Sequence, residues 1–257
     1  MIRSDIFTAA DSGGLAASVI RPRWPVPANV HALITTRAGG MSCGPYASLD
    51  LGAHVGDEPE AVARNRALLR ELLPAEPEWM EQVHGCNVIE ADVVSANSVP
   101  RADGAVTRAP RVVCAVLTAD CLPVLLADRD GTVVGIAHAG WRGLAAGVIE
   151  ATIARMGVAA SALVAYLGPA IGPRAYEVGE DVREVFIARS AAVGDAFEPI
   201  GRGKYLADLY RLARQRLTEA GVTAVGGGDF CTYTDPRFYS YRRDRTTGRM
   251  ASLVWME

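Results

Sequence analysis

A cysteine and a histidine lie at the outer ends of two consecutive apolar segments. Cys121 precedes the segment 123–128 (PVLLAD), and His138 lies near the end of the segment 132–139 (TVVGIAHA). The tight-turn sequence DRDG joins the two segments, so they are predicted to form an antiparallel hairpin with Cys121 and His138 at the same end. A thiol beside an imidazole can act as an activated nucleophile, and the same two groups can hold a metal ion.

A third candidate, His84, lies in QVHGCN, where an apolar segment meets Gly85. Glycine at a strand end allows the backbone to aim a neighbouring side chain into a cavity. Together, His84, Cys121 and His138 would give Zn²⁺ three ligands and leave its fourth position open, as in catalytic zinc sites. Zinc in such a site lowers the pKa of its bound water to about 7. The residues alone equally allow three ordinary core side chains with satisfied hydrogen bonds.

Five further polar residues are candidates for substrate binding. Asp120 precedes Cys121 and could accept a hydrogen bond from an imidazole, or it could cap its own turn. Arg142 lies at a predicted helix start, where it could hold an anion or remain a solvated surface residue. The full set is Arg37, Gln82, Asp120, Arg142 and Arg242, and its three arginines suit a phosphate dianion.

The cysteines and histidines also exclude several kinds of site. The five cysteines are odd in number, scattered, and without a CxxC pair, so we expect neither structural disulfides nor a cysteine-rich zinc site. The HxE and PCxxC signatures of zinc cytidine-type deaminases are absent. His31, at a strand start, and His54, before a helix, have ordinary structural explanations. Four histidines in total are too few for the copper cluster of a laccase, although one copper in a His₂Cys site remains an alternative to zinc.

The elements that must position these residues are short strands mixed with helices. Strands are predicted at 31–37, 79–93 (interrupted at Gly85), 102–108, 112–118, 123–128, 132–139 and 162–173, the last running into a Gly/Pro loop. Helices are predicted at 57–72, with Asp57 as N-cap, and at 143–157, 178–189 and 204–222, stopped by Gly221. Because strands and helices do not alternate regularly, we predict an α/β or α+β fold with a mixed sheet.

Composition and charge limit the class of protein. The 257 residues are 50% hydrophobic and 21% charged, and no linker divides them, so a single domain over 1–257 is predicted. The net charge of −3 gives no reason to expect nucleic acid as a partner, apart from the local arginine cluster YRRDRTTGR. No apolar stretch reaches about 18 residues and the start has no signal-peptide core, so we expect no membrane partner and a cytoplasmic protein, with a monomer favoured.

Six motifs, taken together and in order, resemble one known family. They are GGMSCGPYASLDLGAHVGD, QVHG, ADCLPVLL, AHAGWRGLAAGVIE, LGPAIGPRAYEVGEDV and FYSYRRDRTTGRMASLVW, and they span about residues 30–257. They are similar to the laccase-domain or polyphenol-oxidase family, also called YfiH-like. The resemblance implies mixed β-sheets between helical layers, as in the catalytic domain of cytotoxic necrotizing factors. It also implies that His84, Cys121 and His138 are metal ligands.

The resemblance implies a zinc-dependent purine nucleoside enzyme. Its expected reactions are phosphorolysis of adenosine, inosine, guanosine and methylthioadenosine, and deamination of adenosine, with purine nucleoside and phosphate as partners. A bacterial branch edits peptidoglycan, which leaves a Cys/His amidase acting on UDP-muramoyl-serine as the alternative. A copper polyphenol oxidase and a non-catalytic binding protein are less favoured. One departure is Asp50 in SLDLG, where the family has Asn, since an ionised Asp accepts but does not donate hydrogen bonds.

Overall fold

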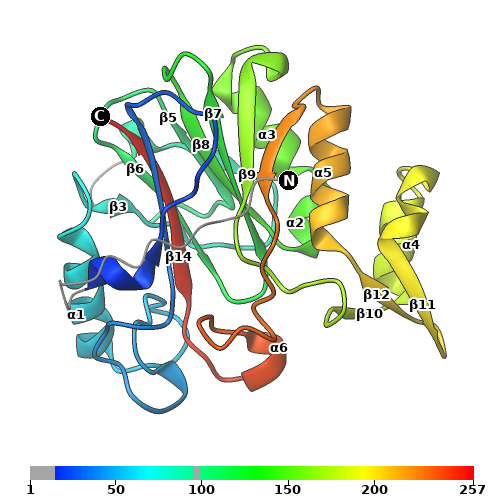
Figure 1. Ribbon diagram of the computed structural model, residues 1–257, viewed down its shortest axis with the longest axis horizontal. Coiled ribbons are helices and arrows are strands. Elements are labelled where there is room, and N and C mark those ends of the chain that lie inside the picture. Colours follow the sequence, from blue (N-terminus) through cyan, green and yellow to red (C-terminus); the bar gives the residue numbers. More distant parts are fainter. Residues whose placement is uncertain (1–14, 95–98) are drawn as a thin grey trace.

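Two β-sheets packed face to face form the centre of the computed structural model, which describes residues 15–94 and 99–257 (Figure 1). The five-stranded sheet has the order β1 (Val19–Ile20), β2 (Val30–Thr35), β14 (Met250–Met256), β6 (Val113–Thr118) and β3 (Pro77–Glu78). The six-stranded sheet has the order β13 (Ala224–Gly227), β9 (Leu163–Leu167), β7 (Leu122–Asp128), β8 (Val134–Ala139), β5 (Gly104–Thr107) and β4 (Val88–Glu90). Both contain parallel and antiparallel pairs, so the predicted mixed sheet is confirmed.

Helices cover the outer faces of the two sheets (Figure 1). Helix α1 (Pro59–Arg70) covers the five-stranded sheet, whereas α2 (Trp141–Ala146), α3 (Val148–Met156) and α5 (Leu209–Glu219) cover the six-stranded sheet. A small sheet of β10 (Glu177–Gly179), β12 (Lys204–Ala207) and β11 (Phe197–Gly201) projects to one side with α4 (Glu180–Ile187). The remaining helices are α6 (Tyr241–Asp244) and the 3₁₀ turns Leu15–Ser18, Gly44–Tyr46, Ala91–Val93, Ala160–Ala162 and Ala191–Ala196. The predicted sheets between helical layers are confirmed.

Strand β7 shows why its sequence is apolar at successive positions. Leu125 and Ala127 point into the core between the two sheets, whereas Val124 and Leu126 point into the core beneath the helices. Side chains alternate between the faces of a strand, so a strand that is buried on both faces needs apolar residues throughout.

The predicted hairpin of β7 and β8 is confirmed. Pro123 lies opposite His138 in the antiparallel register, which places Cys121 just before the first residue of β7, beside the end of β8. Asp128 closes the turn, because its carboxylate accepts hydrogen bonds from the backbone N–H of Thr132 (2.7 Å) and Val133 (3.0 Å) and from the Thr132 hydroxyl (2.7 Å).

Two predicted helices have different bounds. The helix expected at 143–157 begins at Trp141 and is broken at Gly147, whose φ of 96° ends α2 before α3 begins. The helix expected at 204–222 starts at Leu209, because Asp208 caps it by accepting the Arg211 N–H, and its first four residues form β12. These predictions were wrong at boundaries where one residue leaves the helical conformation.

The N-cap of α1 also differs from the prediction. Glu58 holds that position, while Asp57 accepts a hydrogen bond from the Ser42 hydroxyl at 2.5 Å. Asp57 therefore connects the glycine-rich segment 38–52, which contains Ser42, to the start of α1.

The strand predicted at 79–93 was also wrong over most of its length. Strand β3 ends at Glu78 and β4 begins at Val88, so the residues around His84 form a loop. His84 has a φ of 59°, which does not fit a strand. Strand β14, for which the sequence patterns predicted no element, pairs with both β2 and β6.

No helix in residues 15–94 and 99–257 is long and apolar enough to cross a membrane. The expectation that the chain start lacks a signal-peptide core concerns residues 1–14, which lie outside the described residues.

Replacing Asp128 by Ala should destabilise the protein by about 2 kcal/mol, because three hydrogen bonds to a buried carboxylate are lost. Burial opposes ionisation, yet the hydrogen bonds from Thr132 and Val133 hold the pKa of Asp128 below its usual value. The stabilisation is therefore fully present above the unfolded pKa of about 3.9 and is lost as the pH falls through the lower folded pKa. Urea unfolding of wild type and D128A at pH 7 and pH 3 measures this, with D130A in the exposed turn as control. Equal unfolding free energies for wild type and D128A at pH 7 would contradict this role of Asp128.

Candidate metal centre

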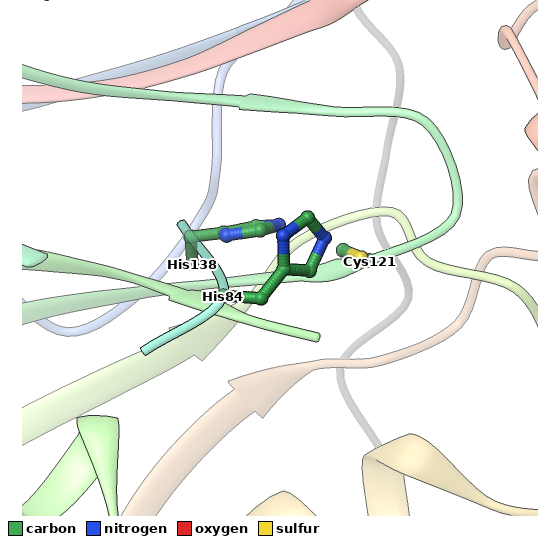
Figure 2. Close-up of side chains that lie close together, drawn as sticks. All are labelled: His84, Cys121 and His138. Carbon is green, nitrogen blue, oxygen red and sulfur yellow. The ribbon is translucent and has the colours of Figure 1, made fainter. Parts of the chain in front are cut away.

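His84, Cys121 and His138 converge at one edge of the sheet pair (Figure 2). Their ligand atoms all lie within 4.8 Å of one another, and the two imidazole rings meet edge to face with centroids 4.8 Å apart. His138 is buried, Cys121 is partly buried and His84 is exposed. The cluster is therefore anchored in the core on one side and accessible on the other.

Cys121 reaches this position because the chain changes sheet immediately before it. Strand β6 ends at Thr118 in one sheet, and β7 begins at Leu122 in the other. Asp120 turns the chain between them with a φ of 89°, a region that Asp visits more readily than bulky residues do. The cysteine thus lies at the crossing point between the two sheets.

Asp120 has a different role from the one predicted. Its two carboxylate oxygens accept hydrogen bonds from the Thr232 hydroxyl and from the Arg242 backbone N–H, both at 2.6 Å. Neither of the two roles considered for Asp120, orienting an imidazole or capping its own turn, matches these partners. Instead, it fixes the crossing point to the segment that precedes β14.

A buried carboxylate that sequence reasoning missed, Asp103, orients both histidines. It accepts a hydrogen bond from His138 Nδ1 at 2.8 Å, and it also accepts the backbone N–H groups of His84 (2.9 Å), Gly85 (2.7 Å) and Val83 (3.2 Å). The first contact fixes the tautomer of His138 and leaves its Nε2 as the ligand atom. The other three hold the loop that carries His84. An acidic residue between Ala102 and Gly104 at a buried strand start was the available signal.

Two glycines in the GWRG motif allow the close packing around the cluster. A Cβ atom at Gly140 would lie 2.7 Å from Cys121 Sγ, and one at Gly143 would lie 2.9 Å from the backbone oxygen of Gly85. Both distances are shorter than a van der Waals contact. Arg142, between them in sequence, is exposed and stacks on the Trp141 ring at 4.4 Å.

The cluster changes the protonation of its own members. Burial raises the pKa of the Cys121 thiol, but the adjacent His138 and His84 more than offset this and lower it to about 6. Burial lowers the pKa of His138, but the Cys121 thiolate and Asp103 more than offset this and raise it to about 9. The pair thus favours the Cys121 thiolate, which is the form that binds metals, together with the His138 imidazolium, whose Nε2 proton a metal ion would displace.

The donor set fits one metal ion of the zinc or copper type. A thiolate and two imidazoles are ligands that both metals accept. Three protein ligands are enough for a catalytic site, because the fourth position of the metal stays open for water or substrate. Among the residues that the structure describes, this is the only cluster of three or more such side chains. His31 stacks on Trp255 with ring centroids 5.5 Å apart. The residues therefore fit a single ion and not a multi-copper cluster.

A pocket of about 250 Å³ opens onto the cluster. Besides the three candidate ligands, it is lined by His54, Gln82, Leu117, Thr118, Ala119, Tyr241 and Arg249. Burial, followed by the charges of Arg249 and Arg66, lowers the pKa of His54, which keeps its ring neutral. Sequence reasoning gave no role to His54 or Arg249. Their signals were a histidine in the glycine-rich segment LGAHVGD and an arginine directly before the last apolar segment.

The other predicted substrate-binding residues are distributed differently. Gln82 lines the pocket, and its amide donates one hydrogen bond to the backbone oxygen of Leu117 and accepts one from the Leu117 backbone N–H. Arg37 donates to the backbone oxygen of Ala47 and lies over the Tyr239 ring, away from the pocket lining. Arg242 lines a separate pocket.

Asp50, the residue that departs from the family pattern, is completely buried and absent from the pocket lining. Its carboxylate accepts the backbone N–H of Gly52 at 2.9 Å and of Arg249 at 2.8 Å. Asp50 therefore positions the Arg249 backbone and does not line the pocket itself.

Comparisons with known proteins identify the family of this chain. Residues 31–257 match the family described as multi-copper polyphenol oxidoreductase laccase. A purine nucleoside phosphorylase of Pseudomonas aeruginosa is 55% identical over 93% of this chain and 98% of its own length. The purine nucleoside phosphorylase YfiH of Escherichia coli is 53% identical over 93% of this chain and 99% of its own length.

Solved structures share the fold as well. The crystal structure of a Neisseria meningitidis protein superimposes with a TM-score of 0.91 at 51% identity, covering 93% of this chain and 99% of the other. The crystal structure of YlmD from Geobacillus stearothermophilus superimposes with a TM-score of 0.82 at 34% identity, covering 91% of this chain and 93% of the other. The chain therefore belongs to the laccase-domain, YfiH-like family that its six motifs predicted.

Proposed function

We propose that this protein is a zinc-dependent purine nucleoside phosphorylase. The observation that carries the proposal is the pocket in which His84, Cys121 and His138 lie beside the guanidinium-bearing residue Arg249. The names of the relatives from Pseudomonas aeruginosa and Escherichia coli support the same reaction. Deamination of adenosine is a second reaction that we infer for the same pocket.

His84, Cys121 and His138 would hold the ion. When bound, Zn²⁺ supplies a Lewis acid with an open coordination position in the pocket. Asp103 keeps the His138 ring in the tautomer that exposes Nε2, and it holds the backbone on both sides of His84. Asp103 thus sets the orientation of the His138 ring and the position of the His84 backbone.

Arg249 is the residue that we assign to phosphate. In phosphorolysis a phosphate oxygen forms a bond to C1′ of the ribose, the bond from C1′ to the purine breaks, and the purine leaves with the electron pair and takes up a proton. Arg249 is the only arginine or lysine in the pocket lining, and its Nη1 is held by the backbone oxygens of Thr247 and Gly248. A fixed guanidinium can bind two phosphate oxygens at once. The neutral His54 can donate a hydrogen bond to the purine.

One specific observation also favours the amidase as a second candidate. Cys121, His138 and Asp103 form a nucleophile, a base and an orienting carboxylate in series, because Asp103 binds His138 Nδ1 and leaves Nε2 toward the thiol. In that reaction the sulfur would form a bond to the carbonyl carbon, the C–N bond would break, and His138 would protonate the departing amine. Water would then hydrolyse the thioester.

Turnover of nucleosides with and without phosphate tests the proposed reaction. The zinc-loaded protein should consume adenosine and inosine to free purine and ribose 1-phosphate only when phosphate is present. His84→Ala should lose bound zinc and at least about 100-fold in kcat, because one ligand of three is removed. Cys86→Ala, an exposed residue two positions away, is the matched control. Consumption of UDP-muramoyl-serine alone would favour the amidase instead, and an active His84→Ala variant would refute the three-ligand site.

Asp103→Asn should weaken zinc binding by about 10- to 100-fold, since an amide cannot accept all the hydrogen bonds that the carboxylate receives. Competition with a chromogenic chelator measures the zinc Kd. Asp130→Asn, in the exposed hairpin turn, provides the same chemical change away from the cluster. An unchanged zinc Kd in a folded Asp103→Asn variant would rule out this positioning role.

Arg249→Lys should raise the KM for phosphate about tenfold while changing the KM for nucleoside much less, because lysine keeps the charge but loses the two-point contact. Arg37→Lys should leave both constants unchanged, since Arg37 is not in the pocket lining. Steady-state kinetics with each substrate varied in turn measures both. A parallel rise in both KM values for Arg249→Lys would assign this residue to general packing.

A further inference from the structure

A second hollow of about 590 Å³ collects positive charge beside the metal centre. Four cationic side chains line it, namely Arg174 from the loop after β9, Lys204 from β12, and Arg242 and Arg245 from α6 and its C-cap. Glu177 is the only carboxylate in the lining. The arginine cluster that stood out in the sequence thus forms part of a cationic pocket with residues about 40 and 70 positions earlier.

Most of this charge is not neutralised within the part of the chain that the structure describes. Lys204 forms an ion pair with Glu177 at 3.7 Å. Arg242 donates to the backbone oxygen of Glu177 at 2.8 Å and lies over the Tyr176 ring at 5.2 Å. Arg174 and Arg245 have no carboxylate within 4.0 Å among the described residues. Like charges brought together without counter-charges repel each other, so an anion bound between them is stabilised.

The chemistry of these residues suits phosphate oxygens. Guanidinium groups bind phosphate through paired hydrogen bonds, and lysine adds a mobile point charge. A nucleic acid would need a basic stripe along the surface, whereas the chain as a whole has a net charge of −3. The pocket volume is large enough for a diphosphate. The favoured ligand is therefore a small phosphorylated molecule.

The cationic pocket and the metal-centre pocket are neighbours. Tyr241 lines the metal-centre pocket and Arg242, the next residue, lines the cationic pocket. The Arg242 backbone N–H binds the carboxylate of Asp120, which precedes Cys121. Tyr176, whose pKa is raised mainly by burial, lies close enough to both sites that the charges of Cys121 and Arg242 act on its hydroxyl. The two pockets therefore lie side by side in the fold.

We propose that Arg174, Lys204, Arg242 and Arg245 form a subsite for a diphosphate or phosphate ester carried by a ligand whose other end lies at the metal centre. The assignment of that other end to a nucleoside rests on the proposed function. The anion-binding part does not depend on it.

Isothermal titration calorimetry of the zinc-loaded protein with pyrophosphate, orthophosphate, adenosine and ADP tests the proposal. The triple variant Arg174→Gln, Lys204→Gln, Arg245→Gln should raise the pyrophosphate Kd at least about tenfold. The matched triple variant Arg64→Gln, Arg129→Gln, Arg155→Gln removes the same charge from residues outside this pocket. It should change the pyrophosphate Kd less than about twofold. Glu177→Gln should tighten pyrophosphate binding.

Two further comparisons identify the source of the phosphate. Wild type should bind ADP more tightly than adenosine, and the pocket triple variant should lose that difference. Equal effects of the two triple variants on pyrophosphate, or ADP binding no tighter than adenosine, would overturn the proposal. So would orthophosphate binding as tight as pyrophosphate binding, since that indicates a site for the free co-substrate. Because calorimetry needs no turnover, a failure of nucleoside phosphorolysis leaves the pyrophosphate result unaffected.

Discussion

The carboxylate of Asp103 is the contact on which the metal centre depends. A buried charge is costly unless several donors surround it, and Asp103 is surrounded by the His138 ring and three consecutive backbone N–H groups around His84. Burial opposes its ionisation, yet these donors hold the pKa of Asp103 below its usual value. One charge therefore orders a strand residue and a loop residue at once: the His138 ring cannot turn without breaking its hydrogen bond to Asp103, and the backbone at His84 is held by the same carboxylate.

The change of sheet between β6 and β7 supplies the third ligand. Cys121 follows directly after Asp120, whose side chain is tied to Thr232 and to the backbone of Arg242. The thiolate is consequently coupled to the segment that leads to Arg249 and β14. The fold thus links the candidate ligand Cys121, the residue we assign to phosphate and the cationic pocket through one short connection.

The sequence was sufficient for features that depend on local patterns and insufficient for those that depend on distant contacts. The apolar segments and the DRDG turn predicted the β7–β8 hairpin and hence the proximity of Cys121 and His138. Asp103 was missed because its partners lie about 20 and 35 positions away, and nothing local distinguishes it from a turn residue. Helix boundaries failed where a single left-handed glycine or a capping aspartate decides the outcome. His54 and Arg249 enter the pocket only through the tertiary fold.

The position of β14 bears on how the molecule assembles during synthesis. It pairs with β2 on one side and β6 on the other, yet it follows every other strand of both sheets in the sequence. Until it emerges from the ribosome, β2 and β6 have unpaired edges, and Arg249 has not reached the pocket. The hairpin that carries Cys121 and His138 needs no such delay, because its strands are adjacent in sequence. A nascent chain can therefore bring the candidate ligands Cys121 and His138 together well before the five-stranded sheet is complete.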